Sequence, residues 1–481
     1  MSTIKNNLGW NVLLTVSGYI FPLLTFPYIT RVLGAGNLGL ANFALSVVDY
    51  AILFSTLGLG SIGFRYIPQC NDNIEQRNHV FNHLVTLHLI LSICILIIYT
   101  LCIFLIPQLY EHKLLYFVGV SKIIMNVFLV EWLFQGMQDF RYITIRTLVI
   151  RLLYVIAIFL CVRKSEDYDI YFYLTIAQVV VNAIVNWRYT RKYVTFKLSI
   201  RGCRSYLFPV FSMGINRILF SFYSSFNIIY LGIKCADANV GYFVTATRLY
   251  GIFLSLLTAY NGVFVPYLNS LYGKGDMQNF KHYISYSFSI VAILSIPIGL
   301  GGIVLAPEII RLIAGEGYEP AILPFRIVMI QMLFVSAAQI LENQILLSLK
   351  KFKEVLICTS ISTLLAVIIL FVFVPQYAEV ASAYAVAIPH VIEAILLYYY
   401  ARKALDFKFP GKDFLMSALL SIPLVLICLV AKKAAPNYII SLIVAVPSSV
   451  FLYFIMQCFI IKNEFIVSQW NRLPFKRKIG A

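Results

Sequence analysis

The chain has 481 residues, of which 60% are hydrophobic and only 12% are charged, and its formal net charge is +17. Soluble globular proteins carry about 25% charged residues, so this composition excludes a soluble fold and predicts an integral membrane protein. The excess of Lys and Arg does not indicate a nucleic-acid partner, because the cytoplasmic loops of membrane proteins collect these residues.

Apolar stretches follow one another along the chain, separated by short polar joints. A helix that crosses a bilayer needs about 20 apolar residues. The sequence therefore predicts an all-α membrane protein with about fourteen transmembrane helices. In chain order, we expect spans at 9–30, 42–64, 80–106, 114–135, 144–162, 169–187, 207–231, 241–266, 284–306, 321–347, 354–374, 378–400, 413–431 and 437–461.

Basic residues gather in every second joint. The largest cluster lies at 188–204, and further clusters lie at 350–353, 402–412 and 472–478. Because Lys and Arg favour the cytoplasmic side, we expect both termini in the cytoplasm. The joints are too short to fold as catalytic domains, so we expect no enzyme.

The two halves of the chain resemble each other. The segment 37–40 (NLGL) matches 239–242 (NVGY), and 190–192 (TRK) matches 401–403 (ARK), in the same order relative to the spans. Six helices then repeat as six in the same orientation, an arrangement that transporters use.

This repeat predicts the domain organisation. We expect a six-helix lobe over 1–200, a second six-helix lobe over 201–408, related to the first by a pseudo-twofold axis along the membrane normal, and two extra helices with a basic tail over 409–481. Two such lobes would enclose a cleft, and rocking would open it to either side of the membrane in turn.

Two arginines inside the spans are the main candidates for the cleft. A charge at the bilayer centre costs about 2.5–3.5 kcal/mol, so Arg217 and Arg248 should face a wet cavity or a partner. Asp49 lies on the polar face of the second span, and we interpret it either as their counter-ion or as a protonation site. For the Ser, Thr and Gly residues on the same faces we favour helix packing and interhelical hydrogen bonds.

Three further carboxylates, Glu131, Glu342 and Glu393, also lie inside predicted spans. Each is a candidate, with Asp49, for coupling transport to H⁺ or Na⁺, and each could instead be paired with a basic residue. The chain has no Walker A loop, so ATP hydrolysis within the chain is not expected. The nine cysteines form no CxxC pair, so we expect neither a disulfide framework nor a zinc site. The sequence shows no cluster of metal ligands either, and we expect no metal and no cofactor.

Several loose motifs resemble polysaccharide flippases of the Wzx type. They are FPYITRVLG at 26–34 with NLGL at 37–40, LGLG at 57–60 ahead of Arg65, and TATRL at 245–249 followed by VPYL at 265–268. The chain is identified by these motifs as a member of the multidrug/oligosaccharidyl-lipid/polysaccharide exporter superfamily.

The resemblance implies a bacterial inner-membrane protein with two six-helix lobes arranged in a V. It implies flipping of an undecaprenyl-diphosphate-linked oligosaccharide from the cytoplasmic to the periplasmic leaflet, for O-antigen or other surface polysaccharide. Cationic cavity residues would then meet the diphosphate, and here these would be Arg217 and Arg248, with Arg31 and Arg65 at the helix ends. Asp49 departs from this pattern, because a carboxylate lowers the net positive charge of the cavity.

Other functions stay open at this point. An ion-coupled multidrug exporter of the same fold would prefer acidic cavity residues, and Asp49 and Glu131 are consistent with it. A glycan polymerase, or a scaffold for a glycan-assembly complex, is a further alternative from another class. The expected partners are the lipid-linked oligosaccharide, membrane lipids and other glycan-assembly proteins.

Overall fold

The computed structural model describes residues 2–70 and 73–458, and all regular structure in these ranges is helical. Contacts divide the chain into two units. The first comprises Met1–Val244 with Leu370–Glu379, and the second comprises Thr245–Ile369 with Val380–Ala481. The basic tail that entered the topology argument, 472–478, lies outside the described residues.

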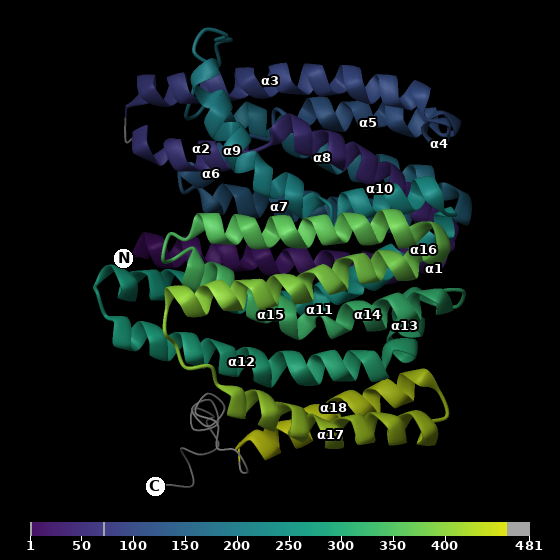
Figure 1. Ribbon diagram of the computed structural model, residues 1–481. Helices are drawn as coiled ribbons and strands as arrows, with labels where there is room; N and C mark the ends of the chain where they lie inside the picture. Colours follow the sequence, from purple (N-terminus) through teal and green to yellow (C-terminus); the bar gives the residue numbers. More distant parts are fainter. Residues whose placement is uncertain (1, 71–72, 459–481) are drawn as a thin grey trace. The chain divides into compact units, whose positions relative to one another are not determined.

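The first unit contains ten α-helices, two 3₁₀ turns, the start of α11 and a short part of α16 within the described residues (Figure 1). In chain order they are α1 (Ser2–Thr56), α2 (Leu59–Tyr66), η1 (Pro68–Cys70), α3 (Ile74–Leu105), α4 (Pro107–Glu111), α5 (Lys113–Asn126), α6 (Glu131–Gly136), α7 (Phe140–Cys161), η2 (Ser165–Asp167), α8 (Tyr168–Thr190), α9 (Arg204–Ser221), α10 (Ser225–Lys234) and α11 (Asp237–Gly273).

The long helix α1 organises this unit by packing against α3, α5, α7 and α10. Two glycines permit its close approach to the start of α11. A Cβ atom on Gly39 would lie 1.8 Å from the Asp237 carbonyl oxygen, and one on Gly241 would lie 2.0 Å from the Ala35 carbonyl oxygen. Backbone meets backbone here, so no side chain fits without moving a helix.

A break divides α1. Its 55 residues would extend about 80 Å as one straight helix, more than twice the roughly 30 Å hydrocarbon core of a bilayer. Gly34 interrupts it with φ 70° and ψ 173°, a conformation that glycine adopts readily. The predicted spans 9–30 and 42–64 lie on either side of this break, and the second continues beyond the end of α1 at Thr56 into α2.

Other predicted helices are also interrupted. The span predicted at 114–135 is divided into α5 and α6, with Val130 in the left-handed region at φ 34°. The span predicted at 207–231 is divided into α9 and α10 by a turn at residues 222–224. Such breaks expose carbonyl groups that need partners within the membrane.

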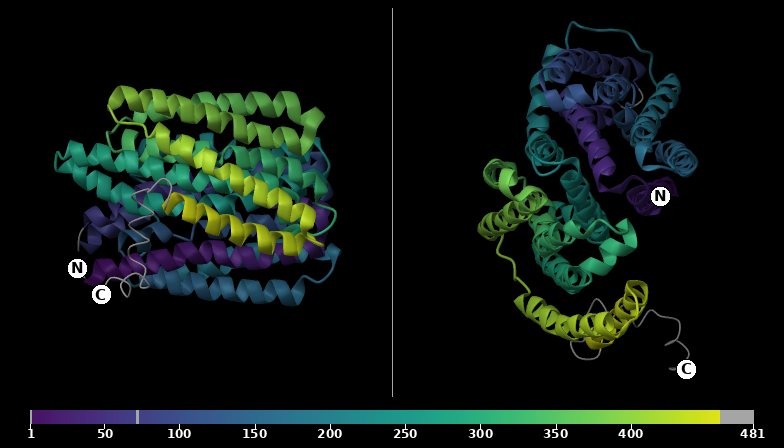
Figure 2. Two further views of the ribbon diagram at one scale, coloured as in Figure 1. Left: turned by 90° about the horizontal axis from the view of Figure 1, so that it is seen from below. Right: turned by 90° about the vertical axis from the view of Figure 1, so that its right-hand side faces the viewer.

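The second unit continues α11 and contains the remaining helices. These are α12 (Met277–Val304), α13 (Ala306–Ala314), η3 (Glu319–Ala321), α14 (Ile322–Ile330), α15 (Met332–Gln339), the π-helical segment η4 (Ile340–Leu346), α16 (Phe352–Ala404), α17 (Gly411–Ala434) and α18 (Tyr438–Met456). The helices α17 and α18 form a hairpin, lying side by side in both views of Figure 2, and α17 also packs against α12. A second break, at Ala378 with φ 43°, divides α16.

Eleven helical segments of the described residues are long and apolar enough to cross a membrane. They include α1 and α16, each counted once although each contains a break. The predicted class, an all-α multi-pass membrane protein, is confirmed, whereas the count of fourteen spans stays a prediction.

Candidate functional site

Asp49 on α1 forms an ion pair with Lys122 on α5. The Lys122 Nζ lies 2.5 Å from the Asp49 Oδ1. The Lys122 side chain is only 9% exposed, whereas that of Asp49 is 48% exposed. A buried ammonium needs such a partner, because an isolated charge in the interior costs several kcal/mol. In this unit Asp49 is thus the counter-ion of Lys122. The predicted pairing of Asp49 with Arg217 is not seen among the ion pairs of the described residues of this unit, and its pairing with Arg248, which belongs to the second unit, stays a prediction.

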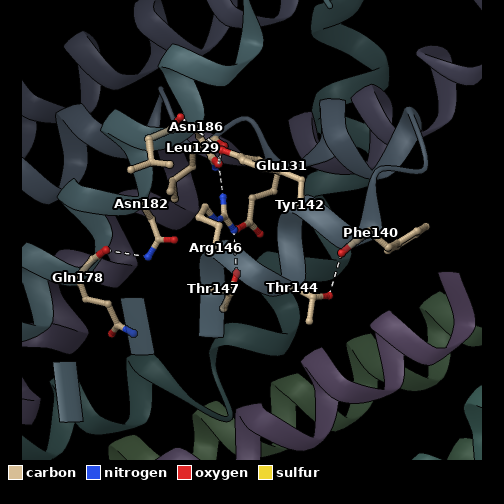
Figure 3. Close-up of polar contacts among 11 residues, drawn as sticks. Leu129, Glu131, Phe140, Tyr142, Thr144, Arg146, Thr147, Gln178, Asn182 and Asn186 are labelled. Atoms are coloured by element: carbon tan, nitrogen blue, oxygen red, sulfur yellow. Dashed lines mark hydrogen bonds and ion pairs between the residues drawn. The ribbon is translucent and has the colours of Figure 1, made fainter. Parts of the chain in front are cut away.

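A second ion pair joins α6 to α7 (Figure 3). The Arg146 Nη2 lies 2.6 Å from the Glu131 Oε1 and 2.9 Å from the Thr147 hydroxyl, and Nη1 donates to the Asn186 side-chain oxygen. The Arg146 side chain is 3% exposed and that of Glu131 is 44% exposed. Both pairs thus bury the cation and leave the carboxylate accessible.

The break between α5 and α6 positions this second pair. Glu131 is the first residue of α6, where the helix dipole favours a negative charge. The Asn186 amide on α8 donates to the Leu129 carbonyl, which the break has left without a helical partner. Asn186 is fully buried and accepts also from the Tyr142 hydroxyl at 3.1 Å. One amide therefore connects α7 and α8 to the broken helix.

The sequence argument missed Arg146 and Asn186. Arg146 lies inside the predicted span 144–162, and a charge at that depth indicates a residue that needs a partner, so the sequence could have identified it. Arg151, one to two turns further along α7, donates to the Ser17 hydroxyl at 2.6 Å and to the Leu14 carbonyl at 3.3 Å. Inward-facing arginines of α7 thus bind α1 and α6.

Asp139 caps the start of α7 and lies outside the spans. Its carboxylate accepts hydrogen bonds from the hydroxyls of Tyr193 at 2.6 Å and Tyr189 at 2.8 Å, and from the Tyr142 backbone N–H at 3.3 Å. Burial alone would raise the pKa of Asp139, but these donors, together with the nearby Lys192 ammonium, hold that pKa below its ordinary value. The carboxylate is therefore ionised and already fully engaged at neutral pH.

Arg217 on α9 is exposed within its unit and has one described hydrogen bond. Its Nη1 donates to the Leu57 carbonyl, 3.1 Å away, at the end of α1. Leu57 adopts a left-handed conformation with φ 42°, and Gly58 and Gly214 let α9 approach this turn closely. Arg217 thus stabilises a helix terminus and leaves most of its guanidinium donors for other contacts.

The other predicted cationic residues are also exposed. Arg31 on α1 and Arg65 on α2 belong to the first unit, and Arg248 on α11 belongs to the second unit. A joint role for Arg217 and Arg248 stays a prediction, because they belong to different units.

In the second unit, the Asn261 side chain on α11 donates to Gln339 on α15 and accepts from Gln344 in the π-helical segment, both at 2.8 Å. Glu393 accepts a hydrogen bond of 2.9 Å from the Thr359 hydroxyl. Glu342 lies in the π-helical segment, and such segments are often found at functional sites. Neither glutamate has an ion pair with a basic residue in the described part of this unit. Within the same ranges, no three His, Cys, Asp or Glu side chains gather as a metal site would require.

The chain matches relatives of known description over most of its length. A protein described as an O-antigen transporter in Escherichia coli (strain K12) is 24% identical over 395 residues, which cover 80% of this chain and 94% of that protein. Among solved structures, the lipid II flippase MurJ in an inward closed conformation superposes with a TM-score of 0.81.

That superposition covers 95% of this chain and 99% of MurJ at 15% identity. An inward-facing multidrug resistance transporter of the MATE family superposes with a TM-score of 0.61 over 80% of this chain and 94% of its own, also at 15% identity. At these identities the two likenesses establish the fold alone.

A family model described as "Polysaccharide biosynthesis protein" matches residues 4–272, more than half of the chain. The resemblance to polysaccharide flippases is thereby confirmed at the level of the family. The chain belongs to the polysaccharide biosynthesis protein family.

Proposed function

We propose that this protein is a flippase that moves an undecaprenyl-diphosphate-linked oligosaccharide from the cytoplasmic to the periplasmic leaflet of a bacterial inner membrane. The observation that carries the proposal is the alignment with the O-antigen transporter of E. coli over 94% of that relative. The product would be O-antigen or another surface polysaccharide. The multidrug alternative is not favoured, because its support is a shared fold alone.

We propose fourteen spans for this flippase, with both termini in the cytoplasm. The breaks at Gly34 and Ala378 support two crossings each for α1 and α16, since each helix is far longer than a bilayer is thick. The helices α9 and α10 together would form one more crossing, which is not among the eleven segments counted above. Lobes over 1–200 and 201–408, with helices over 409–481, follow from the sequence repeat.

We propose further that Arg217 and Arg248 bind the diphosphate, with Arg31 and Arg65 attracting it at the helix ends. All four side chains are exposed within their units, as an anion-binding role requires. A guanidinium about 4 Å from a phosphate charge contributes roughly 4 kcal/mol at an effective dielectric near 20, before desolvation. Two such contacts would draw the headgroup from the membrane surface, while the polyprenyl tail stays in lipid.

Ion coupling, if the flippase uses it, is best assigned to Glu342 and Glu393. Asp49 forms an ion pair with Lys122 and Glu131 forms one with Arg146, so each of these carboxylates already neutralises a buried cation. Among the described residues of the second unit, Glu342 and Glu393 have no such cation. H⁺ or Na⁺ would therefore act in the second unit.

The test is surface glycan in a deletion strain that carries plasmid-borne variants. Arg248→Ala should abolish surface glycan while the protein still inserts at the normal level. Lys433→Ala is the control, because it removes an exposed positive charge from the last turn of α17. Normal glycan with Arg248→Ala would remove Arg248 from the site, and normal glycan in the deletion strain itself would refute the function.

A further inference from the structure

An open cavity of about 610 Å³ lies in the first unit, where α7 begins and α8 ends. Its lining has two parts. Arg141 and Lys192 stand among the polar residues near the helix ends, whereas Ile145, Val149 and Val185 form an apolar wall further along the helices. A cationic part joined to an apolar wall matches the two parts of a lipid molecule.

The two basic residues at the helix ends are available for a ligand. Arg141 is exposed, and its side chain has no hydrogen bond or ion pair in the part of the chain that the structure describes. Lys192 is 59% exposed, donates one hydrogen bond of 3.1 Å to the Tyr189 hydroxyl, and lies 4.0 Å from the Asp139 carboxylate, the limit of an ion pair. Two tyrosine hydroxyls and a backbone N–H already satisfy Asp139, so the Lys192 N–H groups that do not bind Tyr189 can be donated to another anion.

Arg146 adds a buried cation to the lining. Its side chain is 3% exposed, and its Nε has no acceptor within the described residues. A buried donor without an acceptor is uncommon in folded proteins and calls for a partner. The three cations around the cavity outnumber the carboxylates Asp139 and Glu131 by one, which favours an anion.

The apolar wall continues as a stripe along α7. Ile145, Val149, Leu152 and Ile156 are between 43% and 52% exposed, and their spacing of four, four, three and then four residues from Arg141 places them on one helical face. Residues 145 to 156 extend over about 16 Å, close to half of the roughly 30 Å hydrocarbon core. The stripe therefore has the length of an acyl chain within one leaflet.

We propose that this cavity binds an anionic phospholipid, with its phosphate between Arg141 and Lys192 and one acyl chain along the stripe of α7. Basic pockets between transmembrane helices are suited to anionic headgroups. On the proposed topology this lipid belongs to the cytoplasmic leaflet. The site lies within one unit, and its assignment does not depend on which molecule is transported.

The test measures phospholipid retention by the purified full-length protein with native mass spectrometry. The double variant Arg141→Gln/Lys192→Gln should weaken the affinity for phosphatidylglycerol about 10- to 30-fold, since each basic contact contributes about 1 kcal/mol. Affinity for phosphatidylcholine should not change. Both positions are exposed, so an unchanged melting temperature in phosphatidylcholine micelles verifies the fold of the variant.

The matched control is Arg163→Gln/Lys164→Gln, which removes the same charge at the opposite end of the same helix pair, where both residues are exposed. It should retain wild-type affinity for phosphatidylglycerol. Equal losses in both double variants, or no loss in the first, would overturn the site. Displacement of phosphatidylglycerol by millimolar inorganic phosphate or by equimolar undecaprenyl phosphate would also overturn it, in favour of a simple anion site or a carrier-lipid site.

Discussion

Replacing Glu131 by Gln removes the carboxylate that faces Arg146 and leaves a nearly isosteric amide. The change does not create a cavity, so its effect reports on charge. Arg146 keeps its hydrogen bonds to Asn186 and Thr147 but loses its counter-charge. The converse variant, Arg146→Gln, leaves Glu131 with 44% of its side chain exposed, where water can solvate it.

The magnitude follows from the geometry of the pair. Opposite unit charges 4 Å apart attract by about 1 kcal/mol in water and about 4 kcal/mol at an effective dielectric of 20. Arg146 is almost fully buried and Glu131 is half-exposed, so we expect a coupling of about 2 kcal/mol, between these limits. Glu131→Gln should cost more than Arg146→Gln, because only the former leaves a buried charge unpaired.

The assay is a double-mutant cycle in which reversible unfolding of the protein is followed in mixed detergent micelles. The double variant Glu131→Gln/Arg146→Gln should be more stable than the sum of the single effects predicts, by about 2 kcal/mol. Its transport activity should recover relative to Glu131→Gln, because the carboxylate serves the buried cation. A coupling below about 0.5 kcal/mol, within the range of additive sites, would refute the structural interpretation. A stable double variant without transport would instead assign Glu131 to ion coupling.

Three other perturbations test the packing and charges of the first unit. Gly39→Val should destabilise the protein by about 3 kcal/mol or more, because its side chain would overlap the α11 backbone, whereas Gly36→Ala, with no atom within 4 Å of the new Cβ, should melt like the wild type. Asp139→Asn should lower the melting temperature at pH 7. Because the folded-state pKa of Asp139 is lowered, the contribution of this carboxylate to stability is complete above about pH 4 and is lost as pH falls through the folded-state pKa. Equal differences in melting temperature between wild type and variant at pH 7 and pH 3 would contradict this prediction. In the same unfolding assay, Asp49→Asn should lower the free energy of unfolding by about 2 kcal/mol, because it leaves the buried Lys122 charge unpaired. Lys122→Met should lower it much less, since a methionine fills the buried volume without a charge, and the reverse order would contradict the burial of Lys122.

Hydrophobicity predicted most of the spans, and local chemistry predicted some of their breaks. Gly34 lies in a polar joint between two apolar stretches, so the interruption of α1 was foreseeable. The break between α9 and α10 was not foreseeable, because residues 222–224 include no Gly or Pro and continue the apolar pattern.

The candidate site, too, could be predicted from the sequence only in part. The cost of charge in a bilayer correctly marked Asp49 and Glu131 as residues that need partners. Sequence could not identify Lys122 and Arg146 as those partners, because pairing depends on how α5, α6 and α7 pack. Asn186 carries no charge, and its importance arises only from the carbonyl that the broken helix exposes.

The central claim is transbilayer movement of a lipid-linked oligosaccharide, and reconstituted vesicles test it most directly. The purified protein is inserted into vesicles that hold a fluorescent undecaprenyl-diphosphate-linked oligosaccharide in both leaflets, and a membrane-impermeant quencher is added outside. Wild-type vesicles should lose nearly all fluorescence, whereas vesicles with Arg248→Gln or without protein should lose only the outer-leaflet signal. Wild-type vesicles that retain the inner-leaflet signal would contradict the account.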